Sequence, residues 1–224
     1  MRAAIAIAAA MLAAGCTMTA SKPRPVVAME PAPAPAGWRA IIGADDLARI
    51  DALPQRWSAA RAAALPRYRA ALEEAGPLLA ADGALEHPAL PPGSYNCRLI
   101  SVGRERPRDA PYRAFAPFFC YVRGETGGAL TLTKQTGTDL PGGWLHPDGE
   151  RRYVFLGARQ RRPGDNSLAY GADADRDLAG VVERVAPFRW RLVIPSRRGA
   201  GAIDVYELTP VPAEQQVAEP TPAP

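Results

Sequence analysis

A succession of short apolar segments between Ser94 and Leu208 constrains the fold of this chain more than any other sequence feature. The segments are rich in β-branched and aromatic residues and are bounded by glycine and proline. They are Ser94–Val102, Phe115–Arg123, Ala129–Lys134, Trp144–His146, Arg152–Leu156, Leu178–Val185, Phe188–Ile194 and Ala202–Leu208. Because no long helical pattern separates them, the sequence predicts an antiparallel β-barrel or β-sandwich of about seven to eight short strands.

One turn and one strand can be predicted in more detail. Trp144–His146 and Arg152–Leu156 flank Pro147-Asp148-Gly149, where proline presets one turn dihedral and glycine permits another, so we expect a hairpin. In Phe188–Ile194, apolar and other residues alternate, which predicts one buried face and one face mostly in water. The expected buried set is Phe188, Trp190, Leu192 and Ile194, and the expected wet set is Arg189, Arg191 and Val193.

Helical patterns occupy the part of the chain before the strands, from Trp38 to Gly76. Apolar residues recur there at helical spacing, including the stripe Trp57, Ala60, Ala64, Tyr68 and Leu72. Pro66 interrupts the pattern and predicts a kink or two short helices, and Gly76 predicts the end. We interpret the stripe as core contact. Helices followed by strands indicate an α+β fold in which β structure dominates.

The stretch Arg2–Cys16 has the form of an export signal. A single arginine precedes the uncharged apolar run Ala3–Ala14, which is too short to span a bilayer as a stable helix. The small residues before Cys16 resemble the lipobox of bacterial lipoproteins, although Ala13 stands where leucine is commoner. We therefore expect Cys16 to be the acylated mature N-terminus, with an ordinary secretory signal as the alternative.

The anchor implies a location. Thr17 follows Cys16 and is not the aspartate that marks inner-membrane retention in Gram-negative lipoproteins, so we expect the outer membrane, facing the periplasm. Residues 17–37 are rich in proline and alanine and predict a tether that reaches roughly 60 Å at about 3.1 Å per residue. The predicted organisation is a signal (1–16), this tether, one globular domain (38–210; helical over 38–76, mainly β over 94–208) and a disordered tail (211–224).

Cys97 and Cys120 remain if Cys16 is acylated. Two cysteines in an exported protein form a natural pair, and a loop of this size would stabilise the fold by about 3 kcal/mol on the chain-entropy model. Two separate buried thiols are the alternative. A metal site made of two cysteines alone is disfavoured, because zinc sites use three or four protein ligands.

Several motifs resemble one bacterial family. They are Gly143–Gly157 (GWLHPDGERRYVFLG), Tyr170-Gly171, Asp177–Val185 (DLAGVVERV), Phe188–Pro195 (FRWRLVIP), Asp204–Leu208 (DVYEL), Trp38–Ala40 and Tyr95–Arg98. Together they resemble the bacterial envelope family known as domain of unknown function 4893. The resemblance covers most of residues 38–210 and implies an exported, often lipid-anchored protein without a known activity. It supplies no functional residues.

Candidate chemical sites are few. Asp173-Ala-Asp-Arg-Asp177 begins like a calcium loop, but Leu178 and Arg184 stand where an EF-hand needs glycine and a bidentate glutamate. The imidazoles, His87 and His146, belong to no recognised catalytic motif. We therefore predict no catalytic residue, no metal site and no cofactor.

The charge pattern limits the partners. The net charge of +4 is small for 224 residues, which does not suggest nucleic acid. The clusters Arg104–Asp109 and Arg159–Arg162 are solvated loops or contacts for lipid phosphates and anionic envelope polymers. We expect a non-catalytic envelope lipoprotein that contacts a protein or polymer. The alternatives are a lipocalin-like barrel that carries a small apolar ligand and, third, a hydrolase.

Overall fold

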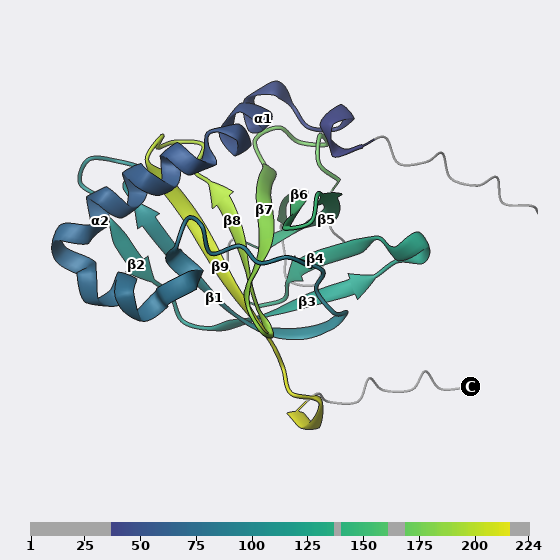
Figure 1. The fold of residues 1–224 in the computed structure, drawn as a ribbon. Helices are drawn as coiled ribbons and strands as arrows, with labels where there is room; N and C mark the ends of the chain where they lie inside the picture. The colour runs from purple at the N-terminus through teal and green to yellow at the C-terminus, as the bar shows by residue number, and fades with distance from the viewer. Residues whose placement is uncertain (1–36, 137–139, 161–168, 216–224) are drawn as a thin grey trace, which may run out of the picture. The chain divides into compact units, whose positions relative to one another are not determined.

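The computed structural model describes residues 37–136, 140–160 and 169–215, all within the compact unit Ala34–Pro224. Two α-helices precede nine strands in these residues, so the predicted β-dominant α+β class is confirmed (Figure 1). Of the two predicted β architectures, the structure has the barrel. The predicted lipid site, Cys16, and most of the predicted tether lie outside the described residues. No described helix is both long and apolar enough to cross a membrane.

Both helices follow the sequence pattern. Helix α1 spans Ala44–Asp51, and α2 spans Leu53–Ala75. The predicted kink is present, because Tyr68, two residues after Pro66, leaves helical geometry with φ −125° and ψ 27°. Gly76 ends α2 with φ 54°, a left-handed value that glycine adopts without strain.

Eight strands close into an antiparallel barrel in the order β1-β3-β4-β5-β6-β7-β8-β9, and β9 returns to pair with β1. Strand β2 lies outside this ring and pairs with the second half of β1. The strands are β1 (Gly93–Gly103), β2 (Tyr112–Ala114), β3 (Phe118–Gly124), β4 (Leu130–Lys134), β5 (Leu140–Asp148), β6 (Arg152–Gln160), β7 (Asp177–Ala186), β8 (Arg189–Pro195) and β9 (Ala202–Pro210). Because β1 and β9 pair with each other, neither strand exposes a free edge on the side where the barrel closes.

The strand predicted over Phe115–Arg123 is wrong at its start. Residues 115–117 separate β2 from β3, and Pro117, which has no N–H to donate, stands directly before β3. The hairpin around Asp148 is confirmed. Its strands are longer than predicted, Pro147 belongs to β5, and the turn lies at residues 149–151, where Gly149 has φ 76°.

Glycines allow β5 and β6 to approach closely. A Cβ atom at Gly157 would lie 2.1 Å from the carbonyl oxygen of Gly142 and 2.5 Å from the Cα of Gly143. These are backbone atoms of the facing strand and cannot turn aside. A contact of this kind marks a place where a strand bends sharply, as a small closed barrel requires.

The barrel interior is one hydrophobic core. Side chains from all eight ring strands pack together there, among them the fully buried Phe155, Leu192 and Leu208 and the nearly buried Trp190. Alternation of side chains along each strand sends the other set outward. Because large side chains occupy the interior, the packing argues against the lipocalin-like carrier, which needs an open apolar interior.

A second core lies between the helices and the outside of the barrel. Side chains of α1 and α2, such as Ile50 and Trp57, pack there against outward residues of β1, β6, β7, β8 and β9. The exposure predicted for β8 is therefore wrong. Arg191 and Val193 are 0% exposed because the helical layer covers the face predicted to be wet, while Phe188 is 72% exposed, in the turn before β8 with φ 53°.

The prediction of a disordered tail from Val211 onward is wrong for residues 211–215. The side chain of Val211 is buried, its N–H donates to the carbonyl oxygen of Ser94, and a 3₁₀ turn follows at Ala213–Gln215. These residues therefore continue the folded domain. Residues 216–224 lie outside the described part of the chain.

Candidate functional site

Cys97 and Cys120 form a disulfide, which confirms the predicted pair. Their Cα atoms are 6.0 Å apart, within the usual range for a disulfide. Cys97 lies on β1 and Cys120 on the neighbouring β3, and both belong to the interior core. The bridge therefore joins two strands of the barrel from the inside.

The other sequence candidates are held within the fold. Asp173 accepts a hydrogen bond from the N–H of Asp175, and Asp177 accepts one from the N–H of Gly171. These carboxylates organise their own loop. Within residues 37–136, 140–160 and 169–215, no three His, Cys, Asp or Glu side chains gather in a way that could hold a metal ion.

The two histidines lie in different settings. His87 is exposed in the connector before β1, and its backbone N–H donates to the backbone carbonyl oxygen of Glu150. His146 is half-buried on β5, and burial lowers its pKa below the usual range of an imidazole.

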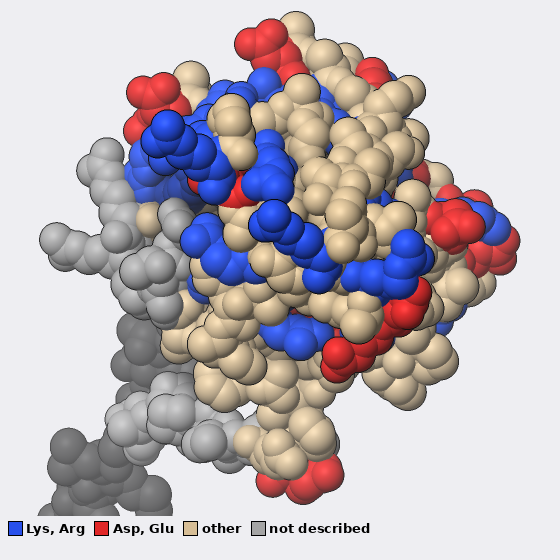
Figure 2. Space-filling model, turned by 90° about the vertical axis from the view of Figure 1, so that its left-hand side faces the viewer, with Lys and Arg blue, Asp and Glu red and all other residues tan. Residues whose placement is uncertain are grey.

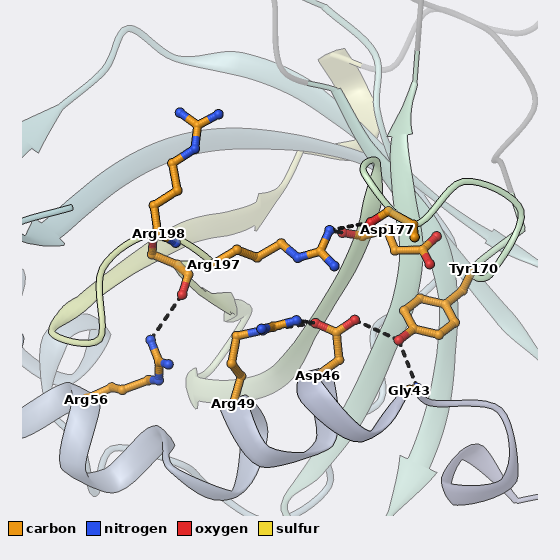
Figure 3. A network of polar contacts seen from close by, with 10 residues as sticks. Gly43, Asp46, Arg49, Arg56, Tyr170, Asp177, Arg197 and Arg198 are labelled. Atoms are coloured by element: carbon orange, nitrogen blue, oxygen red, sulfur yellow. Dashed lines mark hydrogen bonds and ion pairs between the residues drawn. The ribbon is translucent and has the colours of Figure 1, made fainter. Parts of the chain in front are cut away.

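A polar network joins α1 to the loop before β7 (Figure 3). The buried carboxylate of Asp46 forms an ion pair with Arg49 over 2.5 Å and accepts a hydrogen bond of 2.7 Å from the hydroxyl of Tyr170. The same hydroxyl accepts a hydrogen bond from the N–H of Gly43. Tyr170 is more than 120 residues from Gly43 and Asp46 in the chain. Its two contacts therefore fix the start of α1 on the barrel.

Tyr170 gives this network a measurable pH dependence. Burial, followed by its hydrogen bond to Asp46, raises the pKa of Tyr170 to about 12. The folded state then holds this proton more tightly than the unfolded state, so the stabilisation is complete below about pH 10 and is lost as the pH rises from about 10 to about 12. Tyr170→Phe is expected to lower the free energy of unfolding by about 1 kcal/mol at neutral pH.

Urea denaturation between neutral pH and pH 11 checks this expectation. The gap between Tyr170→Phe and the unchanged protein should narrow as the pH rises above about 10. Over this interval the phenol of Tyr170 ionises in the unfolded state while it stays protonated in the folded state, which favours unfolding of the unchanged protein alone. A gap that stays constant over this interval would contradict the assignment.

Arginines also hold the neighbouring loop between β8 and β9. Nη1 of Arg56 donates to the carbonyl oxygens of Ser196 and Gly199, each over 3.1 Å. Arg197 donates to the carbonyl oxygens of Ala174 and Asp177. Figure 3 shows Arg198 pointing away from the other labelled side chains. Burial, and to a smaller extent the nearby charge of Arg49, lower the pKa of Arg56.

Arginine is concentrated on one side of the molecule. The surface that we call the basic face comprises α2 and residues 104–113, which together contain eight arginines and four acidic residues. The arginines are Arg56, Arg61, Arg67, Arg69, Arg104, Arg106, Arg108 and Arg113. Figure 2 shows Lys and Arg side chains spread across the side that is on the left in Figure 1, where α2 and β2 lie.

Some arginines of the basic face form hydrogen bonds within the domain, and others do not. Arg61 donates to the carbonyl oxygen of Leu79, and Arg104 donates to the carbonyl oxygen of Asp109. The guanidinium groups of Arg67, Arg106 and Arg108 are exposed and form no hydrogen bond or ion pair with the described residues. These three groups can therefore meet an anionic partner without breaking a contact that the fold uses.

Sequence reasoning found only one segment of this surface, Arg104–Asp109. The arginines of α2 were not recognised as part of it, because arginine is abundant throughout the chain. They also lie about forty residues before Arg104–Asp109 and are spread among alanines. The other predicted cluster, Arg159–Arg162, is described only as far as Arg159, an exposed residue on β6. The structure therefore adds a surface that the linear pattern did not show.

Comparison with known families matches residues 38–208 to a family described as domain of unknown function (DUF4893). This range begins at Trp38, before α1, and ends at Leu208 in β9, so it includes both helices and all of the barrel except the end of β9. No curated protein and no solved structure matches the chain.

Proposed function

The chain belongs to the DUF4893 family, and from that premise we propose that it is an exported, lipid-anchored envelope protein that acts by binding an anionic envelope polymer on its basic face. The observation that carries the binding role is the set of exposed arginines without described partners, Arg67, Arg106 and Arg108. Guanidinium groups bind phosphate and carboxylate oxygens with paired, charge-assisted hydrogen bonds. No metal or cofactor is needed for such a role.

Two features support export and anchoring. The disulfide between Cys97 and Cys120 is typical of an oxidising compartment such as the periplasm. The stretch that ends at Cys16 resembles a lipobox, and several acyl chains on that residue would hold the chain on a membrane, because each buried methylene adds about 0.8 kcal/mol. On this proposal the membrane is the outer membrane, with the domain facing the periplasm.

Cys16→Ser tests the anchor. The substituted chain is expected to leave the membrane fraction and appear in the soluble periplasmic fraction, and intact-mass analysis of the unchanged chain should show an acylated N-terminus at Cys16. Met29→Ser serves as the control, because it introduces a serine in the predicted tether without touching the signal, Cys16 or the disulfide. Membrane fractionation that is unaffected by Cys16→Ser would refute the anchored role.

Arg108→Glu tests the basic face. With polyphosphate as the probe, the substitution is expected to weaken binding about fivefold, the factor that corresponds to 1 kcal/mol for one lost charge-assisted contact. Binding of the unchanged chain should also weaken as salt is added. Titration calorimetry at two salt concentrations measures both effects.

Arg151→Glu is the matched control. It changes the charge by the same amount but lies in the turn between β5 and β6, where its side chain is 65% exposed and its Nη2 is 4.0 Å from Oε1 of Glu86. Equal losses in the two variants would show a response to net charge alone and would contradict a specific basic face.

A further inference from the structure

The outer faces of β3, β4 and β5 form a surface that neither α1 nor α2 covers. In Figure 1 the helices lie on the left and along the top, whereas β3 and β4 lie on the right. We call this surface the aromatic face and define it by Phe119, Tyr121, Arg123, Thr133 and Trp144, together with the buried Thr131 between Arg123 and Trp144. Strand register makes it continuous, because Tyr121 pairs with Thr133, and Thr131 pairs with both Arg123 and Trp144.

The aromatic face combines exposed aromatic side chains with a positive charge. Phe119 is 52% exposed and Trp144 is 39% exposed, both unusually open for large apolar side chains. The guanidinium carbon of Arg123 lies 6.0 Å from the ring centroid of Tyr121, so a positive charge lies next to this aromatic ring. The six residues include no carboxylate. None of these six side chains therefore repels phosphate groups.

The start of the described chain lies beside this face. The indole Nε1 of Trp38 donates to the carboxylate of Asp148 over 3.2 Å, and Asp148 ends β5, the strand that carries Trp144. Four residues of extended strand separate Asp148 from Trp144, about 13 Å. The chain that precedes Trp38 leads to Cys16, so an anchor at Cys16 is joined to the domain close to the aromatic face.

We propose that the aromatic face docks the domain on the surface of the lipid bilayer. Trp, Tyr and Phe side chains settle at the boundary between headgroups and acyl chains, while the long side chain of Arg123 reaches lipid phosphates. This orientation leaves the basic face, on the other side of the barrel, directed away from the membrane and open to a polymer. The inference rests on the proposed membrane location.

The full chain carrying Cys16→Ser tests the docking without any contribution from acyl chains. The chain has four tryptophans, and Trp38, Trp57 and Trp190 are at most 5% exposed, so changes in emission report mainly on Trp144. Vesicles of phosphatidylethanolamine and phosphatidylglycerol should shift the emission to shorter wavelength. Brominated acyl chains in the same vesicles should quench it.

Phe119→Ala keeps the Trp144 reporter and removes the most exposed ring of the face. It is expected to lower the vesicle partition coefficient about tenfold, because each exposed aromatic side chain that enters the boundary contributes apolar burial. Phe188→Ala is the matched control, since Phe188 is 72% exposed in the turn between β7 and β8 and lies outside the face. The control should partition as the parent chain does.

Three outcomes would overturn the docking. The first is emission that vesicles do not change, and the second is an equal loss of partition in Phe119→Ala and Phe188→Ala. The third is a lipid-free emission shift that grows with protein concentration, which would assign the face to a second copy of the chain. Because this chain carries no acyl group, failure here leaves the Cys16 anchor intact, and failure of the anchor leaves this measurement unaffected.

Discussion

Arg191→Met is expected to lower the free energy of unfolding by about 3–5 kcal/mol, the range found when one partner of a buried ion pair is removed. Arg191 is 0% exposed, and its Nη2 lies 2.6 Å from Oε2 of Glu183. Its Nη1 also donates to three carbonyl oxygens of the turn after α2, those of Pro77, Leu78 and Ala80. Methionine keeps much of the volume but leaves Glu183 and these carbonyls without their donor.

The side chain also joins the two layers of the domain. Its guanidinium carbon lies 4.8 Å from the ring centroid of Trp57 on α2, while its backbone is part of β8. A single cation therefore connects the helix, the turn that follows it and the barrel wall. Urea denaturation followed by fluorescence and circular dichroism measures the loss.

Two variants make this expectation specific. Arg198→Met removes an exposed guanidinium group and should have almost no effect, since exposed positions without such contacts tolerate substitution. Arg191→Met combined with Glu183→Gln should be less destabilised than Arg191→Met alone, because the unpaired buried charge is gone. Equal stability of Arg191→Met and Arg198→Met would contradict the role of Arg191.

Removing the disulfide with Cys97→Ala and Cys120→Ala together is expected to lower the free energy of unfolding by about 3 kcal/mol. The bridge closes a loop with a sequence separation of 23 and thereby restricts the unfolded chain. Alanine avoids placing a hydroxyl group in the apolar interior, where Cys97 and Cys120 are 2% and 4% exposed. Urea denaturation with and without a thiol reductant measures the change.

The reductant supplies the internal control. It should destabilise the unchanged chain by a similar amount and should leave the double variant unaffected. If the reductant has no effect on the unchanged chain, even after a cycle of unfolding and refolding, the bridge does not contribute to stability.

The strands and the two helices could be predicted largely from local sequence, but the face of the barrel that the helices cover could not. Short β-branched segments with turn residues between them identified the strands of the ring, since both signals act within a few residues. Phe188 shows the limit of this reasoning, because it continues the alternation of β8 but falls in the turn and is exposed. Alternating side chains define the two faces of a strand, but the alternation does not predict which face another layer will cover.

The same limit applies to the candidate sites. Cysteine number and the predicted compartment were sufficient to pair Cys97 with Cys120, because few pairings were possible. Asp46 and Tyr170 are 124 residues apart, and no local pattern brings them together. The basic face is likewise assembled from α2 and the loop after β1, which become neighbours only when the helix packs on the barrel.

The sequence by itself determined the β-dominant α+β class, most of the strands, the kink after Pro66 and the cysteine pair, because each depends on propensity, turn chemistry or a small number of choices. Only the tertiary structure decided that the strands close into a ring, that Arg191 is buried and that arginine and aromatic side chains lie on separate faces. Those properties depend on which surfaces pack against one another. Packing joins residues that are distant in the chain, and it therefore has no signature in a local window.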